Sequence, residues 1–126
     1  MKKWLEPFDW GFVTATNQMM CENKKAHHGP TSDGHALASG EWEIKRQEEM
    51  SLTEAIDFCR SCHRMAPFTN FNGNTFSAIA RTIIANAGFD PLDQTLARSL
   101  AGHIVAGVAE EGEVEAFREL CAKLGG

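Results

Sequence analysis

Helix start and stop signals punctuate the second half of the chain at close intervals, and they restrict the fold more than any other feature. Ser51 and Glu54 have the spacing of a capping box, in which each side chain accepts a hydrogen bond from the other residue's backbone N–H. Pro67 ends the helix that this box opens, because the residue before a proline disfavours the helical region. Asp90-Pro91 then combines an N-cap with a proline at the first helical position. The punctuation predicts short helices joined by short connections.

Apolar residues recur at helical spacing between these signals. They predict helices over 51–66, 74–87, 90–112 and 114–124, the second of them followed by Gly88 as a helix-ending residue. The third of these helices contains small residues that let a neighbouring helix approach closely, and a row of larger residues expected to face the core. The small residues are Ala97, Ala101 and Gly102, and the row is Leu92, Leu96, Leu100, Ile104 and Val108.

The first half of the chain has weaker signals. Residues 8–24 carry apolar side chains near helical spacing and predict a helix. Residues 25–40 are rich in turn-forming residues and predict a loop, and residues 41–50 alternate weakly, as in a short strand or an extended arm. The length of 126 residues predicts a single domain over 1–126, with 25–50 as a loop or extended arm. The predicted fold class is all-α, a compact bundle of about five helices with a long N-terminal loop.

Charge and apolar length exclude two classes of partner. The formal net charge is −5, the sequence pI is about 5.5, and the basic residues Lys24, Lys25, Arg60 and Arg64 are scattered. Nucleic-acid-binding surfaces need a basic face, so no nucleic-acid partner is expected. No stretch approaches the roughly 18 consecutive apolar residues of a membrane-spanning helix, and no signal-like apolar core follows the N-terminal lysines. We therefore expect no membrane partner and a cytoplasmic protein whose four cysteines are free thiols.

An asparagine-rich turn, Asn70 to Phe76, stands directly before an apolar helical run. Its short polar side chains and its glycine leave backbone N–H groups free at a helix start, where the helix dipole favours an anion. This pattern predicts a phosphate or nucleotide site, with Arg81 in the same helix or Arg64 in the preceding helix supplying positive charge. A turn that only caps the helix accounts for the same residues. The candidate anion-binding residues are Asn72, Gly73, Asn74, Thr75 and Arg81.

The segment Cys59-Arg60-Ser61-Cys62-His63 matches the pattern of covalent haem attachment. In that chemistry both thiols bond to the haem and the histidine ligates iron, and His103 is the only later histidine in the chain. Cys59 and Cys62 also lie on the apolar stripe of a predicted helix, where free cysteines behave as small core residues. The same segment offers half of a zinc site. Further candidate metal ligands are Cys21, His27, His28 and His35.

The stretch from Pro67 to Leu92 resembles the Fic/Doc family. The shared layout is a helix, then Pro67-Phe68, Gly73-Asn74, an apolar helix and Ala87-Gly88. The remaining helices, 96–124, are similar to the closing helices of the small Doc-type members, so the resemblance covers about half of the chain. Members of this family transfer a nucleotide or a phosphate group onto proteins. The resemblance implies an anion-binding turn at Gly73 and Asn74.

Three functional positions of that family hold other residues in this chain. The family's general-base histidine falls at Phe68, or at Ala66 if the loop carries an insertion. Its acidic metal-binding residue falls at Asn72, and its first arginine falls at Phe76. Nucleotide transfer needs a base and positive charge at the phosphate. The resemblance therefore implies a degenerate member that binds phosphate without transferase activity.

Three functional hypotheses follow from these patterns. The leading one is a ligand-binding or regulatory module with an anion site at 72–75. The second is a haem or metal protein that uses Cys59, Cys62 and His63. The third is a module that binds a partner protein or forms a homo-oligomer through exposed tryptophans, which concentrate at interface hot spots. Those tryptophans are Trp4, Trp10 and Trp42.

Overall fold

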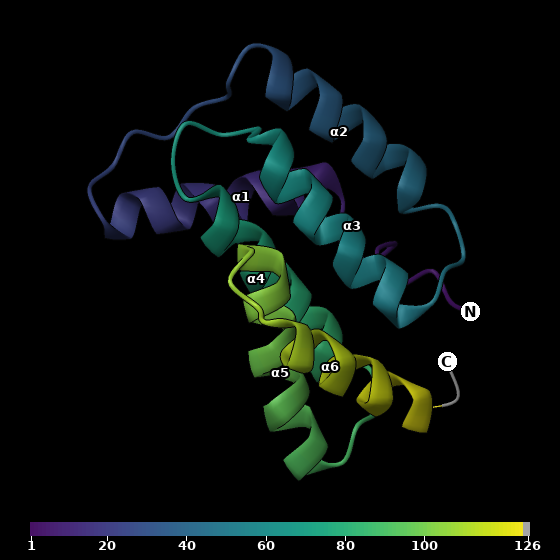
Figure 1. The fold of residues 1–126 in the computed structure, drawn as a ribbon. Helices are drawn as coiled ribbons and strands as arrows, with labels where there is room; N and C mark the ends of the chain where they lie inside the picture. The colour runs from purple at the N-terminus through teal and green to yellow at the C-terminus, as the bar shows by residue number, and fades with distance from the viewer. Residues whose placement is uncertain (125–126) are drawn as a thin grey trace.

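The computed structural model describes residues 1–124 and folds them into six α-helices joined by short connections (Figure 1). Strand pairing within these residues is limited to two isolated bridges, Lys2 with Met50 and Pro30 with Phe68. The predicted all-α class is confirmed, with one helix more than expected. None of the helices in residues 1–124 has the length and apolar content needed to cross a bilayer. The helices are α1 (Trp10–Asn23), α2 (Asp33–Lys45), α3 (Leu52–Met65), α4 (Asn72–Ala85), α5 (Pro91–Ala106) and α6 (Glu111–Lys123).

The pair formed by α4 and α5 is the most extensive helix contact of the fold. α3 packs against both of these helices, while α1 packs on α4, α2 on α3, and α6 on α5. In Figure 1, α2 runs alongside α3 at the top and α6 crosses in front of α5 at the bottom. This arrangement brings the end of α3, the start of α4 and the second half of α5 to one place.

The helix α2 is the main difference from the sequence prediction, which expected a loop and an extended arm over residues 25–50. Trp42 is fully buried, and its Nε1 donates a hydrogen bond of 2.7 Å to the carbonyl of Phe8. Gly34 and Gly40 each disfavour a helix by about 1 kcal/mol. Burying a tryptophan side chain with its N–H paired contributes more than that. Tertiary packing therefore stabilises a helix that local propensity disfavours.

Two of the predicted helix starts are confirmed in detail. The Oγ of Ser51 accepts the N–H of Glu54 at 3.1 Å, and Oε1 of Glu54 accepts the N–H of Ser51 at 3.3 Å. The Asp90 carboxylate accepts the N–H of Asp93 at 3.0 Å at the start of α5. The end of α5 comes earlier than predicted, because Gly107 adopts a φ of 83° and terminates the helix.

Small residues set the face that α5 presents to α4. Ala97, Ala101 and Gly102 are buried, as expected for a close approach between two helices. The predicted row of larger residues is only partly buried, because the contact line follows the small residues instead. Leu100 and Ile104 are buried, whereas Leu92, Leu96 and Val108 are exposed by 84%, 48% and 67%.

The three tryptophans are not the exposed anchors that the interaction hypothesis requires. Trp42 is fully buried, and Trp4 and Trp10 are half-buried against the core. Trp10 stacks on Phe68 with ring centroids 5.7 Å apart, and its Nε1 donates to Nε2 of His35 at 3.2 Å. These rings hold α1, α2 and the α3–α4 connection together, which leaves no free aromatic face for a partner at Trp42.

Candidate functional site

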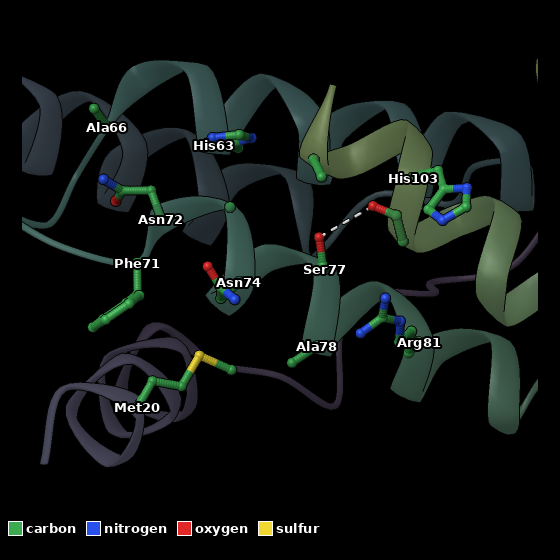
Figure 2. Close-up of a pocket in the computed structure, with 13 residues that line it drawn as sticks. Met20, His63, Ala66, Phe71, Asn72, Asn74, Ser77, Ala78, Arg81 and His103 are labelled. Atoms are coloured by element: carbon green, nitrogen blue, oxygen red, sulfur yellow. Dashed lines mark hydrogen bonds between the residues drawn. The ribbon is translucent and has the colours of Figure 1, made fainter. Parts of the chain in front are cut away.

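A cleft of about 660 Å³ opens where the end of α3, residues 72–81 of α4 and the second half of α5 meet (Figure 2). Met20 of α1 and Phe71 border one side of it, and Arg81 and His103 border the other side. The cleft includes the turn that the sequence predicts as an anion site. Four of the five predicted residues line it, namely Asn72, Gly73, Asn74 and Arg81.

The first turn of α4 has no side-chain cap. Its N-cap residue, Phe71, is apolar and adopts left-handed backbone angles (φ 59°, ψ 34°). The Asn72 side chain turns back onto the α3–α4 connection, where its Nδ2 donates to the Phe68 carbonyl at 2.8 Å and its Oδ1 accepts the Phe68 N–H at 2.9 Å. This side-chain amide therefore shapes the turn. Left-handed angles cost energy in a residue with a large side chain, and such strain is concentrated at functional sites.

Three backbone N–H groups at the start of α4, those of Asn72, Gly73 and Asn74, have no acceptor within the described chain. The next N–H, that of Thr75, bonds to the carbonyl of Phe71 at 2.9 Å and closes the first helical turn. The three residues with free donors border the cleft and lie at the positive end of the α4 dipole. This is the arrangement by which helix N-termini bind phosphate and other anions.

Thr75 was predicted to bind the anion, and the structure places it elsewhere. Its side chain is fully buried, and its Oγ1 accepts a 3.0 Å hydrogen bond from Nδ2 of Asn17. The buried Asn17 also donates to the carbonyl of Asn70 at 2.7 Å, and its Oδ1 pairs with Nδ1 of His28 at 2.9 Å. Thr75 thus belongs to a polar network that ties α1 to the start of α4. The helical rotation points this side chain toward α1 and away from the cleft.

The imidazole of His63 reaches the first turn of α4 from the end of α3. Its Nδ1 lies 2.8 Å from the carbonyl of Val105, and this nitrogen carries the proton because a carbonyl can only accept. A Cβ at Gly73 would lie only 3.2 Å from Nε2 of His63. The imidazole can occupy this place because residue 73 has no side chain. Its Nε2, the nitrogen with a lone pair in the neutral ring, is thereby held beside Gly73.

Arg81 lies flat against α5 on the other side of the cleft. A Cβ at Gly102 would be 2.5 Å from Nη2 and 2.8 Å from Nε of Arg81, so the guanidinium occupies the space that a side chain would fill. No carboxylate within residues 1–124 forms an ion pair with Arg81. Ser77 links the same two helices by donating its Oγ–H to the Gly102 carbonyl at 3.3 Å (Figure 2). Arg64, the other predicted source of charge, is exposed and does not line the cleft.

His103 is oriented by the start of α6. Its Nδ1 lies 2.7 Å from Oε2 of Glu113, and this hydrogen bond is the main cause that lowers the pKa of the Glu113 carboxyl. The other carboxylate oxygen of Glu113 accepts the N–H of Glu110 at 3.2 Å. One carboxylate therefore caps α6 and holds an imidazole at the cleft.

Cys59 and Cys62, the alternative haem or metal ligands, lie in the core. Both residues are fully buried; burial raises the pKa of Cys59 to about 12 and is the main cause that raises the pKa of Cys62. The third member of that set, His63, turns its ring toward α4 and α5. Covalent haem attachment needs thiols that a porphyrin can reach, which these positions do not provide. No three His, Cys, Asp or Glu side chains of residues 1–124 gather so that they could hold a metal ion.

Sequence reasoning missed part of the cleft. His103 had no role in the predicted anion site, and His63 was a candidate only for haem or metal. Gly102 was expected to let a helix approach, and it also makes room for the Arg81 guanidinium. The small residue at position 102 was the one available signal, but helical spacing does not identify which side chain fills the space.

The cleft brings together three backbone N–H groups without an acceptor in residues 1–124, the Arg81 guanidinium and two imidazoles whose Nδ1 atoms are bonded to Val105 and Glu113. No carboxylate of the described residues lines it. Such a donor set suits an anion with several oxygen atoms, above all a phosphate group. No protein-family model matches this chain, and no match is found among the curated proteins or the solved structures.

Proposed function

We propose that this protein is a small helical module that binds a phosphate-bearing ligand, such as a phosphate ester or a nucleotide, in the cleft at the start of α4. One observation carries the proposal: residues 72–74, whose N–H groups have no acceptor within the described chain, line a cleft that also contains the guanidinium of Arg81 and no carboxylate of the described residues. The volume of about 660 Å³ is in the range of small-molecule sites. We expect it to act in the cytoplasm, where thiols such as its four buried, free cysteines stay reduced.

The cleft offers two positions for negative charge. The first is the turn at Gly73, and the second is the guanidinium of Arg81. The Cα atoms of Gly73 and Arg81 are eight residues apart in the helix, or roughly 12 Å along its axis. The side chain of Arg81 leans back toward the helix start, which shortens the distance between the two positions. A ligand with a phosphate and a second anionic group therefore fits better than a single small ion.

The same geometry argues against a transferase of the Fic/Doc type. The position of that family's base holds Phe68, which is buried and stacked on Trp10. The position of its acidic residue holds Asn72, whose side chain is bonded to the backbone of Phe68. We therefore infer ligand binding or regulation, without nucleotide transfer onto another protein.

Thermal unfolding in the presence of phosphate ligands tests the proposal. The probes are inorganic phosphate, pyrophosphate and a nucleoside diphosphate, with chloride at equal ionic strength as the reference. A ligand at a hundredfold excess over its Kd should stabilise the protein by about 2.7 kcal/mol. Arg81→Gln should weaken binding at least about tenfold, or 1.4 kcal/mol, because it removes the guanidinium from the cleft.

Arg98→Gln is the matched control, because Arg98 is also exposed and does not line the cleft. This variant should bind like the wild-type protein. If none of the three phosphate ligands raises the unfolding temperature of the wild-type protein, the proposed function is wrong.

A further inference from the structure

A second cavity, of about 330 Å³, lies between the N-terminal segment and the last turn of α4. Four residues form its apolar wall, namely Trp4, Pro7, Phe8 and Ile83. Lys2 and Lys3 also line it, and no carboxylate of the described residues borders it. This cavity shares no residue with the cleft at the start of α4.

Backbone hydrogen bonds hold the N-terminal segment in place beside this cavity. The N–H of Lys2 donates to the Met50 carbonyl at 3.1 Å, and the N–H of Met50 donates to the Lys2 carbonyl at 2.8 Å. The N–H of Phe8 donates to the Leu5 carbonyl at 3.0 Å, while the carbonyl of Phe8 accepts Nε1 of Trp42 at 2.7 Å. The wall is therefore formed before any ligand arrives, as is usual for small-molecule sites.

The two ammonium groups have no acidic partner in the part of the chain that the structure describes. Nζ of Lys2 lies 5.2 Å from the centroid of the Trp4 ring, so this cation rests on an indole that lines the cavity. No carboxylate of residues 1–124 forms an ion pair with Lys2 or Lys3. In a protein with a formal net charge of −5, this edge of the cavity is a local positive region.

The lysines are not needed to cap the end of α4. Cations near a helix C-terminus commonly bond to its last carbonyls. Here each of the last four carbonyls already accepts another hydrogen bond: those of Thr82 and Ile83 from Asn86, that of Ile84 from Ala87, and that of Ala85 from Gln94. The ammonium groups are therefore free to meet a ligand.

We propose that this cavity binds a small organic acid, with its apolar body on Trp4 and Ile83 and its carboxylate at the ammonium groups of Lys2 and Lys3. The volume is at the lower end of the range for ligand sites, which favours a small molecule. A polyanion fits less well, because the apolar wall would desolvate its charges. The inference does not rest on the proposed phosphate site.

An NMR titration of the whole chain tests the inference with three ligands of one carbon skeleton: phenylacetate, phenethyl alcohol and phenethylamine. The readout is the assigned indole N–H peak of Trp4. Phenylacetate should shift this peak saturably, with a Kd at least about threefold lower than that of the alcohol. The amine should bind more weakly than the alcohol, because two ammonium groups repel a cation. If phenylacetate leaves the Trp4 peak unshifted, or if the alcohol binds as tightly as the acid, the inference is wrong.

A double variant, Lys2→Gln with Lys3→Gln, removes both charges and leaves the backbone bonds of Lys2 in place. Its Kd for phenylacetate should rise at least about threefold, while its Kd for phenethyl alcohol stays the same. Lys24→Gln with Lys25→Gln is the matched control, because these adjacent lysines are also exposed and do not line the cavity. The control should bind phenylacetate like the wild-type protein. An unchanged Kd in the first double variant would overturn the inference.

Competition with pyrophosphate keeps this inference apart from the proposed function. Because the cavity and the cleft share no residue, saturating pyrophosphate should not displace phenylacetate. If pyrophosphate stabilises the protein and phenylacetate does not bind, only the organic-acid site is wrong. If phenylacetate binds and no phosphate ligand does, only the phosphate site is wrong. Displacement of phenylacetate by pyrophosphate would place the acid in the cleft and also contradict the inference.

Discussion

His63 packs its imidazole directly on Gly73, so that a Cβ at residue 73 would lie 3.1 Å from Cε1 and 3.2 Å from Nε2 of the ring. The same device occurs where the Arg81 guanidinium covers Gly102, at 2.8 Å between Nε and the position of a Cβ. In both cases a glycine on one helix makes room for a basic side chain from another. These two contacts place His63 and Arg81 at the cleft.

Gly73→Ala should weaken phosphate binding with little effect on folding. The added methyl group would lie 3.1 Å from Cε1 of His63, so the imidazole has to move by a few tenths of an ångström, and we expect a measurable increase in Kd. Alanine favours a helix over glycine by about 1 kcal/mol. This gain offsets the free-energy cost of moving the His63 imidazole, so the stability of the fold should change little. Isothermal titration with pyrophosphate and urea unfolding measure the two effects.

Gly112→Ala is the control for that prediction. Gly112 is also the second residue of its helix, α6, and a Cβ there would meet no atom within 4 Å. Its Kd should equal that of the wild-type protein. If Gly73→Ala and Gly112→Ala bind pyrophosphate with equal affinity, the contact between His63 and Gly73 does not contribute to phosphate binding.

Two glycines of α2 should respond in opposite directions to the same substitution. A Cβ at Gly34 would overlap the backbone oxygen atoms of Met65 and Ala66, at 2.6 Å from the latter. A Cβ at Gly40 would meet no atom within 4 Å. Gly34→Ala should lower the free energy of unfolding by more than about 2 kcal/mol through overpacking, whereas Gly40→Ala should raise it by about 0.5–1 kcal/mol. Urea denaturation of both variants checks this, and a gain for Gly34→Ala would show that α2 does not pack on the end of α3 as described.

Asn17→Ala should be strongly destabilising. Asn17 is fully buried, and its removal leaves the Asn70 carbonyl, the Thr75 hydroxyl and the His28 ring without their partners. We expect the free energy of unfolding to fall by about 3 kcal/mol, because buried polar groups without a partner are costly. Gln18→Ala, one residue further along the exposed face of α1, should change it by less than about 0.5 kcal/mol. A loss in Asn17→Ala no larger than in Gln18→Ala would rule out the network as a support of the cleft.

The contact between His103 and Glu113 predicts a loss of stability at acid pH. The pKa of Glu113 is lowered from its ordinary value of 4.5, first by the hydrogen bond from His103 and then by that from Glu110. A carboxyl group whose pKa is lower in the folded state contributes stability above its unfolded pKa. That contribution is lost as the pH falls through the folded pKa. The stability that the His103–Glu113 contact contributes should therefore begin to fall near pH 4.5 and continue to fall below it.

Glu113→Gln isolates the charged contact. Glutamine at this position can still accept the N–H of Glu110, so the start of α6 is retained. The variant should be less stable than the wild-type protein at neutral pH, and the difference should shrink as the pH falls below 4.5. Urea denaturation between about pH 3 and pH 7 measures the difference. If the difference in the free energy of unfolding stays constant between about pH 3 and pH 7, the hydrogen bond between His103 and the charged Glu113 carboxylate does not stabilise the fold.

The buried cysteines should be inert in the folded protein. Burial raises the pKa of Cys59 to about 12, so almost no thiolate is present at neutral pH, and Cys62 is raised in the same direction. An aromatic disulfide reagent should label all four thiols quickly in denaturant. In native buffer it should label them only as fast as the protein opens. Fast native labelling of Cys59 and Cys62 would reopen a ligand role for this segment.

Local signals in the sequence were reliable where a hydrogen bond or a backbone preference acts within one helical turn. The capping box of Ser51 and Glu54 and the start of α5 at Asp90-Pro91 depend only on residues up to three positions apart. The polar turn of residues 70–74 is local in the same way, although α4 begins at Asn72, two residues before the predicted start, and has the apolar Phe71 as its N-cap. These features were predicted because no distant residue is needed to form them.

The sequence by itself determined the helical segments of the second half and the place of a polar turn at a helix start. The tertiary structure decided that α2 is a helix, that Thr75 faces α1, and that His63 and His103 join the cleft. His63 meets Val105 across 42 positions and Trp42 meets Phe8 across 34. Such contacts depend on which helices become neighbours, and the burial that stabilises them has no fixed spacing along the chain. That is why local patterns predicted the turn that we propose binds an anion but not the walls of its cleft.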